Sequence, residues 1–338
     1  GGMTEPTVSV LIVTYESGPV LRRCLAQLKA QTFRDFEIIL IDNGSTDRAA
    51  HEAVKADRSL FLLDNGANLG FAEANNRGAR RARGQWLALL NPDAFAEPDW
   101  LAELVAAVEA HPDTACFTSL QLAADDLKVL DGAGDAMTLM GLPYRMGYRR
   151  ARPAEVPAGE VFGPCGAAML IRRETFVGMG GFEARFFSYC EDVDLGYRLR
   201  LAGGRTRLVP EAVVAHVGSS TLGARSDFAL YHGFRNRLWT FARNTPGVLL
   251  PLALPLHLVA TVVSLLGCVA RGEAGPAWRG LVQVVAGFGR MRREQKGRRG
   301  HVRAVIAAMT FDPLRPPGVG WMCARPERHR HPKRPRGP

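Results

Sequence analysis

The sequence lacks several patterns that would each indicate a particular class of protein. Its six cysteines include no pair at the CxxC spacing of a zinc or redox site, and six thiols in 338 residues are too few for a disulfide framework. No GxGxxG follows the first apolar run and no GxxxxGKS/T occurs anywhere, so the familiar glycine-rich phosphate loops are absent. No signal-peptide pattern precedes that run. We therefore expect a reduced, cytoplasmic protein that binds any nucleotide by other means.

Most of the chain also lacks net charge. The total is +10, but residues 290–338 hold 14 Lys and Arg against 3 Asp and Glu, and the first 289 residues sum to −1. A protein that binds nucleic acid usually carries positive charge on its folded body, so this distribution argues against nucleic acid as the partner. A basic tail is attracted equally well to an anionic membrane.

Apolar residues make up 47% of the chain, which excludes wholesale disorder. Buried-strand and amphipathic-helix patterns alternate over the first 120 residues. This order predicts an α/β fold with a mostly parallel sheet between helices. The pattern weakens into hairpins and loops over 121–157. Strands are expected at 8–13, 36–41, 60–63, 86–90, 165–171, 206–209 and 212–217, and helices at 71–83, 98–110, 191–202 and 226–243.

A long uncharged stretch follows this α/β region. Residues 247–270 contain no charge and are numerous enough to span a bilayer. Pro251 and Pro255 interrupt the stretch, His257 lies between its ends, and a second apolar stretch at 280–289 is too short to cross. We expect a helical pair that lies on or re-enters the membrane surface, with a buried helical hairpin and a true span as alternatives.

Polar residues end two of the predicted strands. Asp42 and Asn43 end one strand, and Asn91 and Asp93 follow another. Asp and Asn favour turns, which is enough to explain either pair on its own. Ligands of open α/β sheets bind at the carboxyl ends of the strands, however, so the pairs together favour a site. Asp93 is a candidate ligand for a divalent cation, which prefers oxygen donors and bridges diphosphates.

The densest group of acids begins the helix at 191. Glu191, Asp192 and Asp194 follow an aromatic run that starts at Phe186. Helix capping explains one or two acids, but not aromatic residues leading into three. An apolar wall beside a carboxylate raises its pKa and suits it to act as a general base. His216 ends a strand shortly afterwards and is a candidate metal ligand.

Six motifs occur in order along the chain: Val8-Ser-Val-Leu-Ile-Val-Thr-Tyr15, Gln31-Thr-Phe33, Ile41-Asp-Asn-Gly-Ser-Thr-Asp47, Asn68-Leu-Gly-Phe71, Leu90-Asn-Pro-Asp93 and Glu191-Asp-Val-Asp-Leu195. In this register they resemble glycosyltransferase family two, which has the Rossmann-like GT-A fold, and its bacterial rhamnosyltransferase branch above all. The resemblance covers residues 7–245. It leaves 246–289 as an apolar helical membrane-associating region and 290–338 as a basic, largely irregular tail.

The resemblance implies a role for each matching residue. Asp192 matches the catalytic base, with Glu191 beside it, and Asp93 and His216 match ligands of Mg²⁺ or Mn²⁺. Asn91 replaces the first acid of the family's DxD motif, which weakens the expected metal site. Arg235 and Asn236 are expected either to approach the donor diphosphate or to belong to a polar helix face. The residues that match donor-binding positions are Thr14, Tyr15, Asp42, Asn43, Asn68, Gly70, Asn75 and Asn91.

These roles imply an inverting transfer from a nucleotide sugar. The resemblance favours dTDP-L-rhamnose as donor and a lipid-linked or cell-surface glycan as acceptor, such as a sugar on a polyprenyl diphosphate. UDP-galactofuranose, UDP-glucose and UDP-N-acetylglucosamine are alternative donors. A basic nucleic-acid-binding protein and an inactive sugar-nucleotide-binding module are alternatives of other classes. The enzyme is expected at the cytoplasmic face of the cell membrane, where its apolar helices and basic tail would hold it.

Overall fold

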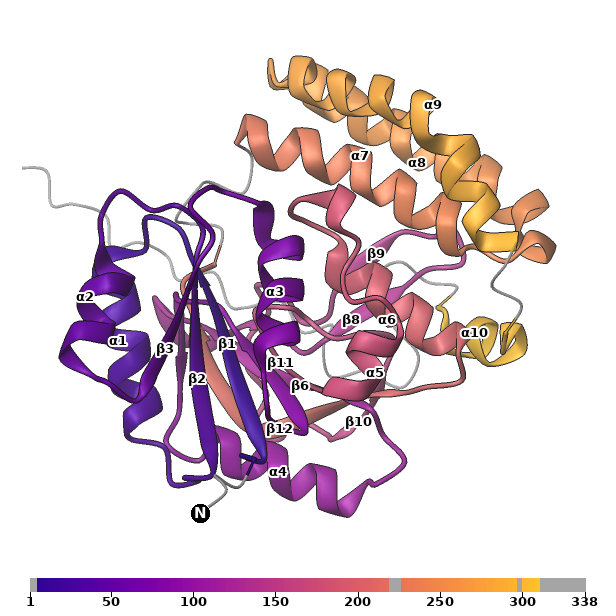
Figure 1. Ribbon diagram of the computed structural model, residues 1–338. Helices are drawn as coiled ribbons and strands as arrows, with labels where there is room; N and C mark the ends of the chain where they lie inside the picture. Colours follow the sequence, from indigo (N-terminus) through magenta and orange to yellow (C-terminus); the bar gives the residue numbers. More distant parts are fainter. Residues whose placement is uncertain (1–4, 219–225, 297–299, 311–338) are drawn as a thin grey trace, which may run out of the picture.

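The computed structural model describes residues 5–218, 226–296 and 300–310, and is built around one large mixed sheet (Figure 1). The strand order along the sheet is β10-β12-β6-β11-β4-β1-β2-β3, with β5 paired to β12 and β7 paired to β6. The four strands β4, β1, β2 and β3 are parallel, and β6 is parallel to β12. Helices flank the sheet, so the predicted α/β architecture is confirmed.

The first half of the chain forms the parallel part of the sheet. In β1, Val10 and Ile12 pack into a core shared with helices α1 and α4, while Leu11 packs into a second core shared with α3 and α6. Strands covered on both faces explain the continuous apolar runs in the sequence. The elements are β1 (Val8–Thr14), α1 (Gly18–Lys29), β2 (Phe36–Asp42), α2 (Ala49–Ala56), β3 (Leu60–Asp64), α3 (Gly70–Arg81), β4 (Trp86–Leu90) and α4 (Trp100–Ala110).

The second half differs from the sequence prediction in its strands. β5 and β6 were not predicted, and the expected loops at 121–157 contain β7 and the small β8–β9 sheet. The two strands expected between 206 and 217 are one strand, β12, whose register shifts between Val209 and Val213. The elements are β5 (Ala94–Ala96), β6 (Cys116–Ala123), β7 (Asp126–Gly132), β8 (Asp135–Met137), β9 (Pro143–Arg145), β10 (Gly159–Val161), β11 (Ala168–Arg172), α5 (Arg173–Gly178), η1 (Ala184–Phe186), α6 (Glu191–Leu201) and β12 (Thr206–His216).

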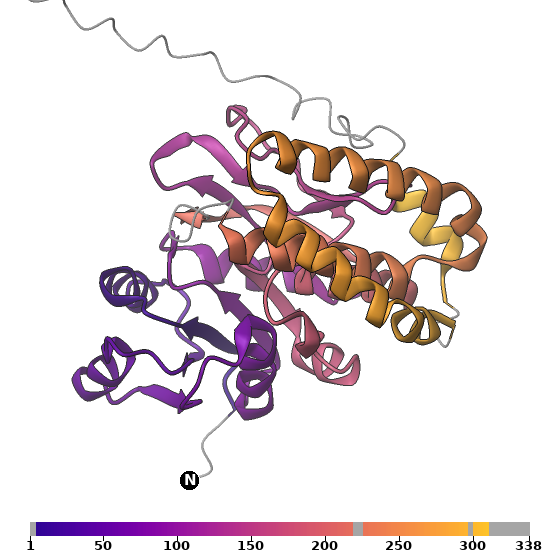
Figure 2. The same cartoon turned by 90° about the horizontal axis from the view of Figure 1, so that it is seen from above.

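Helices α7, α8 and α9 form a separate helical layer, which packs against α6 through α7 (Figure 2). α9 is longer than the apolar stretch expected at 280–289 and runs past residue 290, where the basic tail was expected to begin. α10 then packs against α6, and the remaining tail residues, 311–338, lie outside the described residues. Pro251 lies in the first turn of α8, where proline is tolerated. The elements are α7 (Asp227–Asn244), η3 (Gly247–Leu249), α8 (Leu250–Ala270), α9 (Ala274–Lys296) and α10 (Val302–Ala308).

Candidate active site

The turn that carries Asp93 lies beside the end of β12, which carries His216. β5 leaves this turn and pairs antiparallel with β12, so that Ala94 lies opposite His216. The backbone N–H of Val217 donates to the Asp93 carbonyl oxygen at 3.0 Å and ties the two segments together. Asp93 Oδ1 and His216 Nε2 consequently lie 3.3 Å apart. The structure thus brings the two predicted metal ligands together.

The other ring nitrogen of His216 is held by Asp131 of β7. Nδ1 lies 2.8 Å from Asp131 Oδ2, and the Arg145 guanidinium donates to the same oxygen at 3.2 Å. Burial alone would lower the pKa of His216, but the carboxylates of Asp131 and Asp93 beside its ring outweigh burial and raise the pKa to about 9. A carboxylate on one ring nitrogen commonly orients a histidine whose other nitrogen binds a metal.

Sequence reasoning missed Asp131 and Arg145. Both lie in the segment that was expected to form hairpins and loops. A Cβ atom at position 132 would lie 2.6 Å from Arg145 Cδ, so glycine leaves room there for the Arg145 side chain that reaches Asp131. The available sequence signal was the run Asp131-Gly-Ala-Gly-Asp135, in which two acids bracket two glycines.

The donor atoms at this point fit a hard divalent cation. His216 Nε2 is buried and has no hydrogen-bond partner within the described ranges, and Asp93 presents a carboxylate oxygen toward it. Asn91 also has a buried Oδ1 atom that lacks a hydrogen-bond partner among the residues that the structure describes. Carboxylate and amide oxygens together with one imidazole nitrogen suit Mg²⁺ or Mn²⁺. Asp93, His216 and Asn91 could therefore hold such a cation.

Residues 166 and 167 connect this turn to the start of α6. The Asn91 N–H donates to the Ala167 carbonyl oxygen at 2.9 Å, and the Gly166 N–H donates to Asp192 Oδ2 at 2.7 Å. Asp192 Oδ1 accepts a hydrogen bond from the Val193 N–H at 2.8 Å. Asp192 is half-buried, so its carboxylate is fixed in orientation and still reaches solvent. An acid in this position can accept a proton from an approaching hydroxyl.

The two acids beside Asp192 have different surroundings. Asp194 is fully buried and accepts hydrogen bonds from three side chains of α6 and α7, so it anchors one helix to the other. Burial, reinforced by the negative charges of Asp192 and Asp194, raises the pKa of Glu191 well above its usual range. Glu191 is buried and Asp194 is engaged by three side chains, which leaves the half-buried Asp192 as the acid of the three best placed to act as a base.

The loop at 186–190, which leads into α6, has an unusual backbone held by Asn236 of α7. Three of its non-glycine residues have positive φ: Phe187, Tyr189 and Cys190. Such conformations cost energy and persist where the surroundings enforce them. The fully buried Asn236 amide donates to three carbonyl oxygens of this loop at 2.8 to 2.9 Å. Asn236 therefore fixes the backbone that immediately precedes Asp192.

Arg235 contacts the same loop rather than pointing to open solvent. Its guanidinium donates to the carbonyl oxygens of Arg185 and Phe186 at 3.0 Å each, and lies 4.5 Å from the centre of the Trp239 ring. Through these contacts Arg235, like Asn236, holds the loop against α7. Its predicted contact with a donor diphosphate stays a prediction.

We expect Asn236→Ala to impair both stability and turnover. The substitution removes the amide donor from the Ser188 and Tyr189 carbonyl oxygens, while the Phe186 oxygen keeps its Arg235 and Ser188 N–H donors. Each buried group left unsatisfied costs about 1–3 kcal/mol. Thermal unfolding should show a melting temperature lower by several degrees, and turnover should fall because Asp192 loses its fixed position. Asn244→Ala is the control, because Asn244 is a buried asparagine of α7 that binds Asp194 instead of the loop. Equal losses of turnover in both variants would contradict a specific role for Asn236.

The expected donor-binding residues gather at the carboxyl ends of β1 and β2. Thr14 lies opposite Asp42 in the parallel register, and the Asn43 N–H donates to the Thr14 carbonyl oxygen at 2.9 Å. The Thr14 Oγ1 and Asp42 Oδ1 atoms are buried and have no hydrogen-bond partner in the described part of the chain. Buried polar atoms are nearly always paired in native proteins, so a bound molecule with complementary groups would satisfy both. Tyr15 is 52% exposed at the rim of this group.

Asn43 connects this strand end to the start of α3. Its Nδ2 atom donates to the Gly70 carbonyl oxygen at 3.2 Å, and Asn68 Oδ1 accepts from the Gly70 N–H at 3.0 Å. Gly70 has a φ of +82°, and a Cβ there would lie 2.5 Å from the Phe187 carbonyl oxygen, so glycine is required. Asn75 is buried one turn further on and donates to the Phe71 carbonyl oxygen of its own helix.

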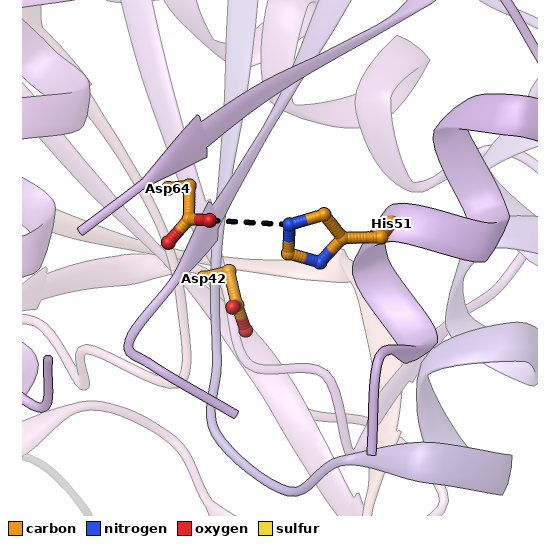
Figure 3. A group of neighbouring side chains, drawn as sticks. All are labelled: Asp42, His51 and Asp64. Carbon is orange, nitrogen blue, oxygen red and sulfur yellow. Dashed lines mark hydrogen bonds and ion pairs between the residues drawn. The ribbon is translucent and has the colours of Figure 1, made fainter. Parts of the chain in front are cut away.

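A second group of possible metal ligands lies at the edge of this region (Figure 3). Ligand atoms of Asp42, His51 and Asp64 all lie within 4.8 Å of one another, and His51 Nε2 is 3.1 Å from Asp64 Oδ2. In the sheet, β1 lies between β2, which carries Asp42, and β4, which leads into the Asp93 turn. This group is therefore separate from the site at Asp93, and it is a second possible position for a metal ion.

Comparison with known proteins identifies the family. The profile of "Glycosyl transferase family 2" matches residues 9–177. The chain is 34% identical over 258 residues to the N-acetylglucosaminyl-diphospho-decaprenol L-rhamnosyltransferase of Mycobacterium tuberculosis, a match that covers 68% of this chain and 82% of that protein. The chain belongs to glycosyltransferase family 2. It is thus a nucleotide-sugar-dependent glycosyltransferase of the branch that contains rhamnosyltransferases.

Solved structures support the GT-A fold of this family 2 enzyme. The structure of GalNAc-T7 with UDP, GalNAc and Mn²⁺ matches 72% of this chain and 51% of that chain, with a TM-score of 0.55 and 20% identity. The mannosyltransferase PcManGT of Pyrobaculum calidifontis, in complex with GDP-mannose and Mn²⁺, matches 90% of this chain and 86% of that chain, with a TM-score of 0.53 and 19% identity. The predicted fold and family are both confirmed.

Proposed function

We propose that this enzyme transfers L-rhamnose from dTDP-L-rhamnose to a hydroxyl group of a sugar carried on a polyprenyl diphosphate. The observation that carries the proposal is the 34% identity to a mycobacterial enzyme named for this transfer, over 82% of that enzyme. The acceptor class requires a site that meets a membrane, and we place the reaction at the cytoplasmic face of the cell membrane.

The proposed reaction is a single displacement. The acceptor oxygen forms a bond to the anomeric carbon of the donor sugar, while the bond from that carbon to the diphosphate oxygen breaks and its electron pair leaves with the diphosphate. Asp192, held by Gly166 and Val193, accepts the proton of the acceptor hydroxyl. Attack from the face opposite the diphosphate inverts the anomeric configuration, and no covalent enzyme intermediate is needed.

The leaving diphosphate needs positive charge rather than a proton. Asp93 and His216, with Asn91 nearby, are the residues that would hold Mg²⁺ or Mn²⁺, which offsets the charge of a diphosphate when bound. Asp131 keeps the His216 ring oriented through Nδ1. The unpaired Thr14 and Asp42 atoms would bind the nucleoside, and the exposed Tyr15 ring lies beside them.

A thermal-shift comparison of nucleotides tests the donor. A ligand present at 100 times its Kd stabilises the native state by about 2.7 kcal/mol, which raises the melting temperature of a protein of this size by a few degrees or more. We expect dTDP to raise the melting temperature more than UDP or GDP, and Mn²⁺ or Mg²⁺ to increase the shift. Greater stabilisation by UDP would contradict the rhamnose donor and favour a UDP-sugar. Turnover of dTDP-rhamnose with a synthetic lipid-linked acceptor then tests the transfer itself.

A further inference from the structure

The most unusual surface of the enzyme is the outer face of α8. Of the 18 large apolar side chains that are exposed among the described residues, 12 lie between 248 and 285. Soluble monomers rarely expose continuous apolar patches of this kind unless the patch binds something. On α8, six residues at every third or fourth position are 41 to 63% exposed: Leu252, Leu256, Val259, Val263, Leu266 and Val269. Leu258 and Val262 are also exposed and widen this face.

The opposite face of α8 is firmly attached to the catalytic domain. His257 is fully buried, its Nδ1 atom lies 2.8 Å from the Met140 carbonyl oxygen, and its ring stacks on Phe241 at 4.2 Å between centroids. The Thr261 hydroxyl accepts a hydrogen bond from Arg237 at 3.1 Å. Insertion of α8 across a bilayer would break these contacts and leave their polar groups without partners in hydrocarbon. The length of α8 would permit a span, but its packing favours a helix that lies along the domain.

The neighbouring helix adds aromatic and positive groups to the same surface layer. On α9, Trp278, Val282 and Val285 are 50 to 80% exposed. Arg279 follows Trp278 and is exposed, and the exposed Arg293 lies eight residues beyond Val285, on the same side of the helix. Tryptophan and arginine beside an apolar surface are typical of the boundary between lipid headgroups and acyl chains. A second copy of the chain would bring these like charges together, so charge favours anionic lipid as the occupant.

We propose that α8 and the exposed side of α9 lie flat in the interface of an anionic membrane, with the apolar face of α8 in the acyl boundary and the arginines among the headgroups. The proposal makes the membrane location given above more specific, and the functional reason for this docking rests on the proposed lipid-linked acceptor. α7 connects the surface to the reaction, because Asn236 holds the loop before Asp192 while Arg237 and Phe241 contact α8. A docked α8 would thus hold the catalytic loop one helical layer from the bilayer, within reach of a lipid-linked sugar.

Vesicle sedimentation of the full chain, without donor or acceptor, tests the docking surface separately from the chemistry. We expect binding to phosphatidylglycerol–phosphatidylcholine vesicles and much weaker binding to pure phosphatidylcholine vesicles. Val259→Glu/Val263→Glu/Leu266→Glu should reduce binding on the order of tenfold or more, because three exposed apolar side chains become charged. The matched control is Leu127→Glu/Val177→Glu/Tyr148→Glu, which changes three exposed apolar residues outside the surface. The proposal would be overturned if the first variant bound vesicles as well as the unsubstituted chain does. It would also be overturned if the substitutions dissociated a dimer of the chain and left vesicle binding unchanged.

The depth of α8 distinguishes a flat helix from a span. Fluorescent labels introduced through Leu252→Cys, Val259→Cys and Leu266→Cys mark positions that extend over about 21 Å of helix. Quenching by lipids brominated at fixed depths should place all three labels at one shallow depth. A central label much deeper than the two outer ones, or a steady change of depth along the helix, would overturn the flat orientation. The rhamnose donor could still be correct in that case, because turnover with a soluble acceptor analogue measures it independently.

Discussion

Asp192→Asn should abolish most turnover while leaving donor binding intact. The amide keeps the shape of the side chain and one acceptor oxygen for the Gly166 or Val193 N–H, but it no longer accepts a proton. Loss of a positioned general base lowers rates roughly 10²–10⁴-fold. Steady-state kinetics should therefore show a fall in kcat of this size, and titration with the nucleoside diphosphate should give an unchanged Kd.

Asp194→Asn provides a matched control two residues away. Asp194 is buried among Arg198, Arg243 and Asn244, so its neutralisation leaves two buried arginines short of a partner and lowers stability. It does not contact the proposed acceptor position, so kcat should be reduced much less than in Asp192→Asn when both are measured well below their melting temperatures. Turnover retained by Asp192→Asn would remove Asp192 from the base role and assign that role to another group.

The strand ends of the site were predictable because parallel strands share an edge. Asp42, Asn43, Asn91 and Asp93 each follow an apolar run of strand length, and the βα order places their carboxyl ends on one side of the sheet. The contact between His216 and the Asp93 turn could not be predicted from the order of the strands. It depends on β5, a three-residue strand that aligns Ala94 with His216 and is too short to show a periodicity.

The features of the site that the sequence did not predict depend on contacts between residues far apart in the chain. Asp131 and Arg145 lie in a segment of short strands whose role comes from the pairing of β7 with β6, beside β12. The left-handed residues before Asp192 are aromatic and cysteine residues, which give no local sign of that conformation. Asn236, on a helix that follows β12, enforces it with three hydrogen bonds. Local patterns located the acids, whereas contacts between distant elements orient them.

Asp93→Asn should remove most of the response to divalent cations. The substitution leaves two amides and one imidazole at the turn, so the carboxylate that a hard cation prefers is lost. We expect kcat/KM to fall roughly 10²–10³-fold, as is common when one group that stabilises developing charge is removed. Asp131→Asn should give a smaller loss, roughly 10–100-fold, because Asp131 acts by orienting His216. The measurement is kcat/KM against Mn²⁺ and Mg²⁺ concentration for each variant.

Asp64→Asn decides between the two possible metal positions. Asp64 belongs to the cluster with Asp42 and His51, and its side chain is 47% exposed, so the substitution should leave stability almost unchanged. If the functional cation lies at Asp93 and His216, Asp64→Asn keeps the full metal response while Asp93→Asn loses it. The reverse pattern would move the cation to the ends of β2 and β3. The buried Nε2 atom of His216, 3.3 Å from the Asp93 carboxylate, would then need another explanation. A direct ion pair within the folded protein would be the simplest one.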